Sequence, residues 1–241
     1  MAGNRILNSA AKNKNDEFYT LYDDIQKELN CYLDYDENVF AGKTILLPCD
    51  DPEWSNFTKF FAANFERYKI KKLISTSYAT DSKKINFNPQ ISLFESESPQ
   101  FDEKITNSRG KIFTMTSPGE KFYLDNLKWN YLEGDGDFRS DEVKKLFAEA
   151  DVIITNPPFS LFREFLKQIL DFDKKFLIIG NINCITYADV FPLIKDNKIW
   201  LGNGMGRWIS GFFVPEGYEL YGTEARIDEK GRRVVATNQC L

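Results

Sequence analysis

The stretch ADVIITNPPFSLF (residues 150–162) joins a short apolar run to two consecutive prolines and an aromatic residue. The run DVIIT has the length and composition of a buried strand. The following SLFREFLKQIL has the apolar spacing of an amphipathic helix, for which we expect Ser160 to be the N-cap. Since a strand followed at once by a helix is the repeating unit of a parallel α/β sheet, this stretch predicts the fold class.

The same alternation extends in both directions along the chain. Phe57, Phe60, Phe61 and Phe65 are spaced as the buried face of a helix, and Ser140 stands where it can cap another. Further strands are expected at TILL (44–47), KKLISTSY (71–78), WNYLEG (129–134), KKFLIIGN (174–181), KIWLG (198–202) and SGFFVP (210–215). Short helices between such strands predict a doubly wound, mostly parallel sheet with helices on both faces.

Composition limits the chemistry. The 241 residues contain no histidine, which excludes histidine triads, imidazole general bases and most catalytic zinc sites. The four cysteines (Cys31, Cys49, Cys184, Cys240) form no CxxC pair, so we expect reduced thiols and no metal site. Any reaction must use carboxylates, amides, backbone groups or a reactive cofactor. Neither a signal-peptide-like segment nor an apolar run of membrane-spanning length is visible, so we expect a cytoplasmic protein.

Asn156-Pro157-Pro158-Phe159 follows the predicted strand, at the edge where ligands bind in such sheets. A residue before proline is held extended, and two prolines stiffen the loop and supply no N–H donors. The Asn156 amide oxygen and the Pro157 carbonyl would therefore present acceptors, with Phe159 beside them. This suits an amino group attached to an aromatic ring; the alternative is a turn that only ends the strand.

Asn156-Pro157-Pro158-Phe159 resembles the [DNS]-PP-[YFW] motif of S-adenosylmethionine-dependent amino methyltransferases. With DEFYT (16–20), LLPCDDPEWSNF (46–57) and EGDGDFRSDE (133–142) in the same order, the chain resembles the EcoRI-type adenine-specific DNA methyltransferases over most of its length. The resemblance implies a Rossmann-like methyltransferase fold. It also implies transfer of methyl from S-adenosylmethionine, leaving S-adenosylhomocysteine, to N6 of an adenine flipped out of double-stranded DNA. Such an enzyme would modify DNA as part of a restriction-modification system, a phage or a mobile element. It would act as a monomer and would need no metal.

The resemblance also implies the site residues. Asn156 and Pro157 would position the amine, Pro158 would stiffen the loop, and Phe159 would stack on the base. The residues implied to contact the cofactor are Tyr19, Thr20, Pro48, Cys49, Asp50, Asp51, Ser77, Gly136, Asp137 and Phe138. Pro48–Asp51 replaces the usual glycine-rich loop, and its two acids could face the sulfonium and amino group or simply cap the next helix. Tyr78 and Asp81 are alternatives to Ser77 for the ribose, and GDGD could be a solvated turn.

We expect residues 1–215 to form the catalytic domain, with an insertion carrying a hairpin at about 80–120 (ISLF, KIFTMT). Residues 216–241, with a turn at Lys230-Gly231, would begin a target-recognition or hairpin segment that stops as if truncated. DNA phosphates could be bound by lysines of 71–84, by Arg207 or by KGRR (230–233), and Phe212 or Phe213 could wall the base pocket. Two alternatives stay open: a methyltransferase of RNA or of a protein amide, and a non-catalytic decoy that binds the cofactor or DNA.

Overall fold

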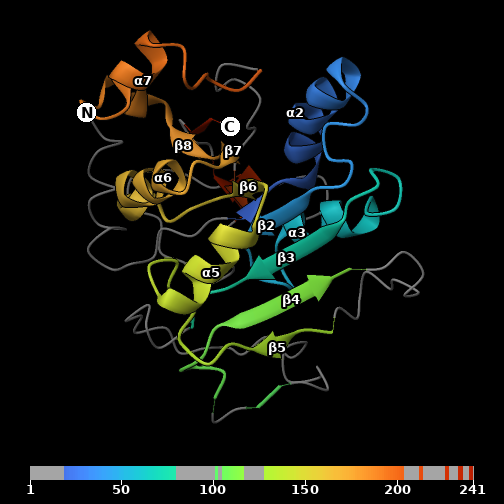
Figure 1. The fold of residues 1–241 in the computed structure, drawn as a ribbon. Coiled ribbons are helices and arrows are strands. Elements are labelled where there is room, and N and C mark those ends of the chain that lie inside the picture. The colour runs from blue at the N-terminus through green and yellow to red at the C-terminus, as the bar shows by residue number, and fades with distance from the viewer. Residues whose placement is uncertain are drawn as a thin grey trace.

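The computed structural model of the chain describes residues 19–79, 101–102, 105–116, 128–203, 212–213, 226–227, 233–235 and 239–240. A six-stranded sheet forms its centre, with the strand order β5-β4-β3-β2-β6-β7 (Figure 1). The strands are β2 (Thr44–Leu47), β3 (Lys72–Thr76), β4 (Lys111–Met115), β5 (Asn130–Tyr131), β6 (Val152–Thr155) and β7 (Lys175–Ile178).

The direction of the strands confirms an α/β fold with a mostly parallel sheet. β2 pairs in parallel with β3 and β6, and β6 pairs in parallel with β7. β4 pairs antiparallel with both β3 and β5, so within the described part of this sheet it alone runs against the others. β4 contains most of KIFTMT, which we expected in an insertion, whereas ISLF lies outside the described residues.

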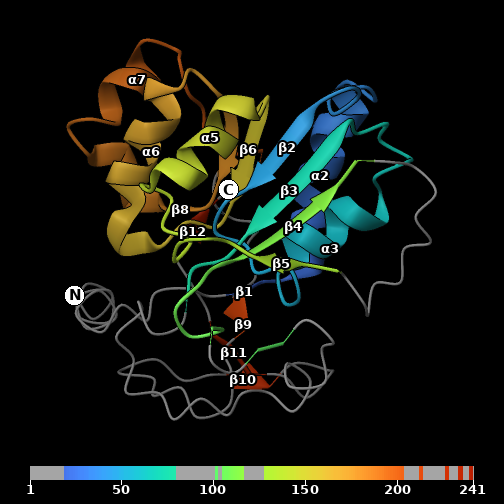
Figure 2. The same ribbon diagram turned by 60° about the horizontal axis from the view of Figure 1, so that its bottom comes forward.

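Helices cover both faces of the sheet (Figures 1 and 2). On one face lie α2 (Tyr22–Tyr35) and α3 (Asn56–Ala63), and on the other lie α5 (Asp141–Glu149) and α6 (Phe162–Asp171). Successive side chains of a strand point to opposite faces of the sheet, so each strand contributes to both cores. Ile45 and Leu47 of β2 pack into the core of the first face, and Leu46 packs into the core of the second. The fold is therefore doubly wound, as the sequence predicts.

The predicted phenylalanine stripe forms the buried side of α3. Phe57, Phe60 and Phe61 are at most 1% exposed, and the rings of Phe60 and Phe61 meet edge to face at 5.5 Å. Ser55 caps α3, because its hydroxyl accepts hydrogen bonds from the backbone N–H groups of Phe57 and Thr58. Phe65 is also buried but follows the helix. The cap and the stripe fix where α3 begins and which face it buries.

Two predictions at the helix ends were wrong. Ser160 does not cap α6, because a 3-10 turn (η2, Phe159–Leu161) intervenes and α6 begins at Phe162. The prolines cause this: Pro158 is extended, and its carbonyl accepts from Leu161 to close the tighter turn. KIWLG is not a strand, because Lys198 N donates to Leu193 O and so closes the end of α7 (Phe191–Lys195).

Two small sheets lie beside the carboxyl ends of the central strands (Figure 2). One has the order β1-β9-β11-β10, and the other pairs β8 with β12. Their strands are β1 (Tyr19–Thr20), β9 (Phe212–Phe213), β10 (Arg226–Ile227), β11 (Arg233–Val235), β8 (Gly180–Asn181) and β12 (Gln239–Cys240). SGFFVP thus contributes β9 to a separate small sheet, and β10 and β11 form an antiparallel pair around the predicted turn at Lys230-Gly231, itself outside the described residues.

Replacement of Ser140 by alanine should lower the free energy of unfolding by about 1 kcal/mol, since its hydroxyl caps α5 by accepting from Val143 N at 3.2 Å. Ser140→Asp keeps a side-chain acceptor at the cap and should stay close to the wild type. Urea unfolding followed by circular dichroism measures both. Equal loss in the two variants would contradict the assignment of the cap.

Candidate active site at the carboxyl edge of the sheet

The loops that follow β2, β3 and β6 meet at one edge of the sheet. Asp50 N donates to Thr76 O at the end of β3, and Cys49 N donates to Thr155 Oγ1 at the end of β6. Asn156 directly follows Thr155 and is 7% exposed. The fold therefore places the predicted cofactor loop against the strand end from which the predicted catalytic loop begins, at the edge where open α/β sheets bind ligands.

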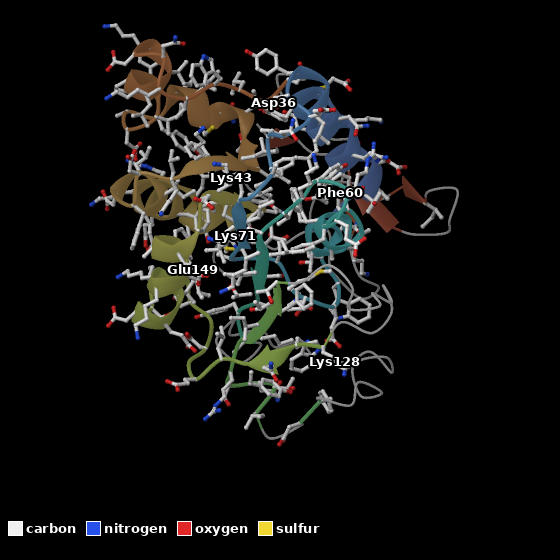
Figure 3. The ribbon with its side chains drawn as sticks, turned by 45° about the vertical axis from the view of Figure 1, so that its right-hand side comes forward. Asp36, Lys43, Phe60, Lys71, Lys128 and Glu149 are labelled. Carbon is white, nitrogen blue, oxygen red and sulfur yellow. The ribbon has the colours of Figure 1, made fainter. Side chains whose placement is uncertain are left out.

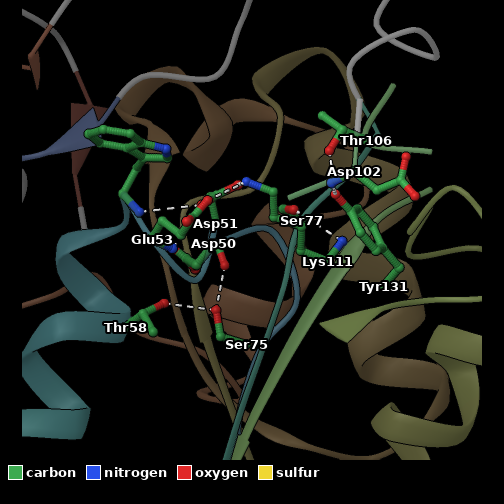
Figure 4. Close-up of polar contacts among 11 residues, drawn as sticks. Asp50, Asp51, Glu53, Thr58, Ser75, Ser77, Asp102, Thr106, Lys111 and Tyr131 are labelled. Atoms are coloured by element: carbon green, nitrogen blue, oxygen red, sulfur yellow. Dashed lines mark hydrogen bonds and ion pairs between the residues drawn. The ribbon is translucent and has the colours of Figure 1, made fainter. Parts of the chain in front are cut away.

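The loop 48–55 keeps its shape without glycine. Asp51 Oδ1 accepts hydrogen bonds from the backbone N–H groups of Glu53 (2.9 Å) and Trp54 (3.3 Å), while Asp51 O accepts from Ser55 N (Figure 4). Pro48 is buried, and its carbonyl accepts from Thr76 Oγ1 at 3.1 Å. Asp51 therefore closes the turn that precedes α3 and does not cap that helix, whose N-cap is Ser55; contact between this loop and the cofactor stays a prediction.

Lys111 is a residue of this edge that the sequence analysis missed. It is 6% exposed, and its Nζ lies 2.6 Å from Glu53 Oε2 and 3.5 Å from Asp51 Oδ2 (Figure 4). The same Nζ lies 4.7 Å from the ring centre of Trp129. Because β4 runs antiparallel to β3, its first residue lies at the edge where the parallel strands end. No sequence signal gives that direction, so only the fold places Lys111 beside the acidic loop.

The loop EGDGDF packs against the end of β3. Gly136 has φ +80°, and a Cβ there would lie 2.1 Å from the backbone oxygen of Ser77. Ala79 N donates to Asp135 O at 2.7 Å, and Gly110 N donates to Gly134 O at 3.0 Å. The structure therefore brings Ser77 together with Gly136, as expected if both border one ligand. Tyr78 is adjacent to Ser77, whereas Asp81 lies outside the described residues.

Asp137 and Phe138 have partners within the protein. Both Asp137 carboxylate oxygens accept hydrogen bonds from the Arg139 side chain, the shorter at 2.6 Å, and these bonds raise the pKa of Arg139. The ring of Phe138 is 4% exposed and packs edge to face against Phe165 of α6 at 5.0 Å. Packing of Phe138 against α6 thus holds the loop in place. The adenine contacts implied for Asp137 and Phe138 stay predictions.

The NPPF loop begins in the buried end of β6 and rises toward the surface. Asn156 and Pro157 are buried, while Pro158 and Phe159 are partly buried, and Phe159 packs against the core that contains α2 and α3. Thr155 O accepts from Ile179 N at 3.2 Å, which ties the loop to the residue after β7. The base of this loop is therefore held by the strands on both sides of β6.

The N-terminal motif reaches the same edge through β1. Thr20 is 4% exposed, and its carbonyl accepts from the Asn56 side chain at 2.6 Å, in the first turn of α3. Among the residues that the structure describes, the buried Thr20 Oγ1 has no hydrogen-bond partner. The register Tyr19↔Phe213 and Thr20↔Phe212 joins β1 to β9, although the side chains of Tyr19, Phe212 and Phe213 are not described.

Of the cations predicted to bind DNA, the two lysines whose side chains are described do not lie at this edge. Lys71 lies just before β3 (Figure 3) and Lys72 is its first residue, about 16 Å from the end of that strand. Lys72 pairs with Glu149 at 2.6 Å. Lys83, Lys84, Arg207 and KGRR, apart from Arg233, lie outside the described residues. In the described part of the chain, no group of three cysteine or carboxylate side chains could hold a metal, and no helix is long and apolar enough to span a membrane.

Comparison with known proteins gives one matching family model and several relatives. The model, described as adenine-specific methyltransferase EcoRI, matches residues 6–241. The type II methyltransferase M.EcoRI of Escherichia coli is 47% identical over 240 residues, 100% of this chain and 68% of the relative. M.MgeORF184P of Mycoplasma genitalium and M.MpnI of Mycoplasma pneumoniae are each 34% identical over 215 residues, 89% of this chain and 56% of each relative. No solved structure matches significantly.

Replacement of Lys111 by methionine should destabilise the protein by about 3 kcal/mol, because Asp51 and Glu53 then lose the cation that neutralises them in a buried place. The double variant Lys111→Met/Glu53→Gln removes one of the two uncompensated charges and should recover at least about 1 kcal/mol. Denaturant unfolding of the wild type and of each single and double variant gives the coupling energy. A double variant no more stable than Lys111→Met would contradict the ion cluster.

Gly136→Ala and Gly42→Ala form a matched pair, since both glycines have positive φ. At Gly42 nothing lies within 4 Å of an added Cβ, so we expect a loss of about 1 kcal/mol from backbone strain alone. At Gly136 the clash with Ser77 O adds to the strain, and we expect about 3 kcal/mol. Thermal unfolding ranks the two. Equal losses would mean that the EGDGDF loop does not pack against β3 this closely.

Proposed function

The chain belongs to the family of adenine-specific methyltransferase EcoRI, and on this premise we propose that it transfers a methyl group from S-adenosylmethionine to N6 of adenine in double-stranded DNA. One observation carries the assignment of the site. The loop after β2 contacts Thr155, the residue directly before Asn156, through the hydrogen bond from Cys49 N to Thr155 Oγ1 at 3.2 Å. A cofactor at the first loop would thus lie next to a base at the second.

Two features support the fit of the cofactor. Gly136 lets the EGDGDF loop pack against Ser77 O, so that residues assigned to the nucleoside end lie together, and the buried Thr20 hydroxyl offers a hydrogen bond. We assign the methionine end to Tyr19, Thr20 and loop 48–51. The nucleoside end is assigned to Ser77, Gly136, Asp137 and Phe138. S-adenosylmethionine would supply an electrophilic methyl group on a sulfonium, so the protein needs no covalent step.

The residues of the NPPF loop orient the acceptor. The Asn156 amide oxygen and the Pro157 carbonyl would accept hydrogen bonds from the adenine amine, which favours a pyramidal nitrogen with its lone pair directed at the methyl group. Phe159, partly buried at the surface end of the loop, would stack on the base. Because adenine N6 lies inside the duplex, the base must flip out before it can reach these groups. Most of the rate enhancement would come from this orientation.

The DNA substrate and the monomeric state implied by the resemblance, and the cytoplasmic location expected from the sequence, belong to this proposal. The relatives are named type II methyltransferases, which supports a role in restriction-modification. The chain spans about half to two thirds of the length of these relatives, so we assign no residues to recognition of the DNA sequence.

Transfer of labelled methyl groups to unmethylated duplex DNA tests the proposal, with RNA and a glutamine-containing peptide as competing substrates. We expect label on adenine N6 of DNA, a loss on the order of 100-fold in kcat for Asn156→Ala, and retained binding of S-adenosylmethionine by calorimetry. Asn156→Asp keeps an acceptor oxygen and should retain more activity. Asn38→Ala, an exposed site before β2, is the control. Label only on RNA or peptide, or cofactor binding without transfer, would refute the assignment.

A further inference from the structure

Thr155, the last residue of β6, is fully buried, and its hydroxyl has two partners in the loop after β2. It donates a hydrogen bond to Asp50 Oδ2 and accepts one from Cys49 N at 3.2 Å. Asn156 is the next residue along the chain. The single hydroxyl of Thr155 therefore joins the residue before the NPPF loop to two of the residues assigned to the cofactor loop.

Asp50 is held from its other sides as well. Its Oδ1 accepts from Ser55 Oγ at 2.6 Å, its N–H donates to Thr76 O at 3.0 Å, and its carbonyl accepts from Ser75 Oγ. The side chain is 5% exposed. With both carboxylate oxygens bound by hydroxyl groups of the protein, Asp50 ties β6 to the capped start of α3.

A hydroxyl bound to a carboxylate inside a protein is a strong and directional contact, because the acceptor is charged and water is excluded. Its partners are the ends of two neighbouring parallel strands, so their relative position along the strand direction is fixed where both loops begin. Methyl transfer requires the donor carbon, the methyl group and the acceptor nitrogen to be in line. A displacement of about 1 Å between the two loops is enough to cost on the order of 100-fold in rate.

We propose that Thr155 is a positioning residue for methyl transfer: its hydroxyl, through Asp50 and Cys49, holds the cofactor loop and Asn156 in register. The inference rests on the proposed function and deepens it. It assigns to Asp50 an organising part in place of direct contact with the sulfonium, and it brings into the site a residue that touches neither ligand.

The test compares Thr155→Val, which removes the hydroxyl at nearly constant volume, with Thr155→Ser, which keeps it. Thr58→Val is the matched control: Thr58 is also fully buried, and its hydroxyl bonds Ser75 Oγ at 2.8 Å, on the side of Asp50 away from β6. For each purified variant the melting temperature, kcat and both KM values are measured, with S-adenosylmethionine and duplex DNA each varied to saturation.

We expect kcat of Thr155→Val to fall at least tenfold at saturation, Thr155→Ser to stay within threefold of the wild type, and Thr58→Val to stay within twofold despite a lower melting temperature. A kcat of folded Thr155→Val within twofold of the wild type would overturn the inference. So would an equal loss in Thr58→Val, which would indicate a general loosening of the core. If Thr155→Val does not fold, Thr155→Ala takes its place and is compared with Thr155→Ser, since these two variants differ only by the hydroxyl. The same changes in kcat are then expected, and the same results would overturn the inference.

Failure of the proposed function gives a different result. In that case the wild-type protein itself transfers no methyl group to adenine, and the inference falls with it. If the wild type methylates adenine and Asn156→Ala does not, the proposed function stands, and the kcat of Thr155→Val then decides the inference alone.

Discussion

A carboxylate can be buried only if its oxygens are hydrogen-bonded, and Asp50 meets this requirement with hydroxyl groups from two different elements. Ser55 belongs to the start of α3, and Thr155 to the end of β6. To satisfy one buried charge, the loop after β2, the first turn of α3 and the strand before Asn156 must adopt fixed relative positions. The remaining features of the edge, including where the NPPF loop begins, depend on this constraint.

A second charged group explains how an acidic loop replaces a glycine-rich one. Glycine in such loops lets the backbone approach a ligand closely. Here Asp51 caps a tight turn through the backbone N–H groups of Glu53 and Trp54, and Lys111 neutralises Asp51 and Glu53 from β4. A glycine is used instead at Gly136, where the backbone of the EGDGDF loop packs closely against Ser77 O. The tight turn and the close-packing glycine therefore lie in two segments far apart in sequence.

The two wrong predictions at helix ends share one cause. Ser160 has the residue type of an N-cap, and Lys198–Gly202 has the apolar content of a strand, but in both places the preceding backbone decides. Pro158 forces a 3-10 turn that delays α6, and Asn197, with φ +60°, turns the chain so that Lys198 bonds back to Leu193. The residue type alone therefore predicts the wrong structure where the backbone groups that a cap or strand would need are already hydrogen-bonded in a neighbouring turn.

By itself, the sequence determined the alternation of strands and helices, the stripe of phenylalanines on α3, the cap at Ser140, and the place of Asn156 after a strand, because each depends on residues a few positions apart. Its four motifs also determined the family. Only the tertiary structure decided the reversed direction of β4, which brings Lys111 to the acidic loop, and the bond from Thr155 to Asp50. These contacts join residues 58 to 105 positions apart, and no local pattern encodes them, since they exist only once strand order and direction have set the edge of the sheet.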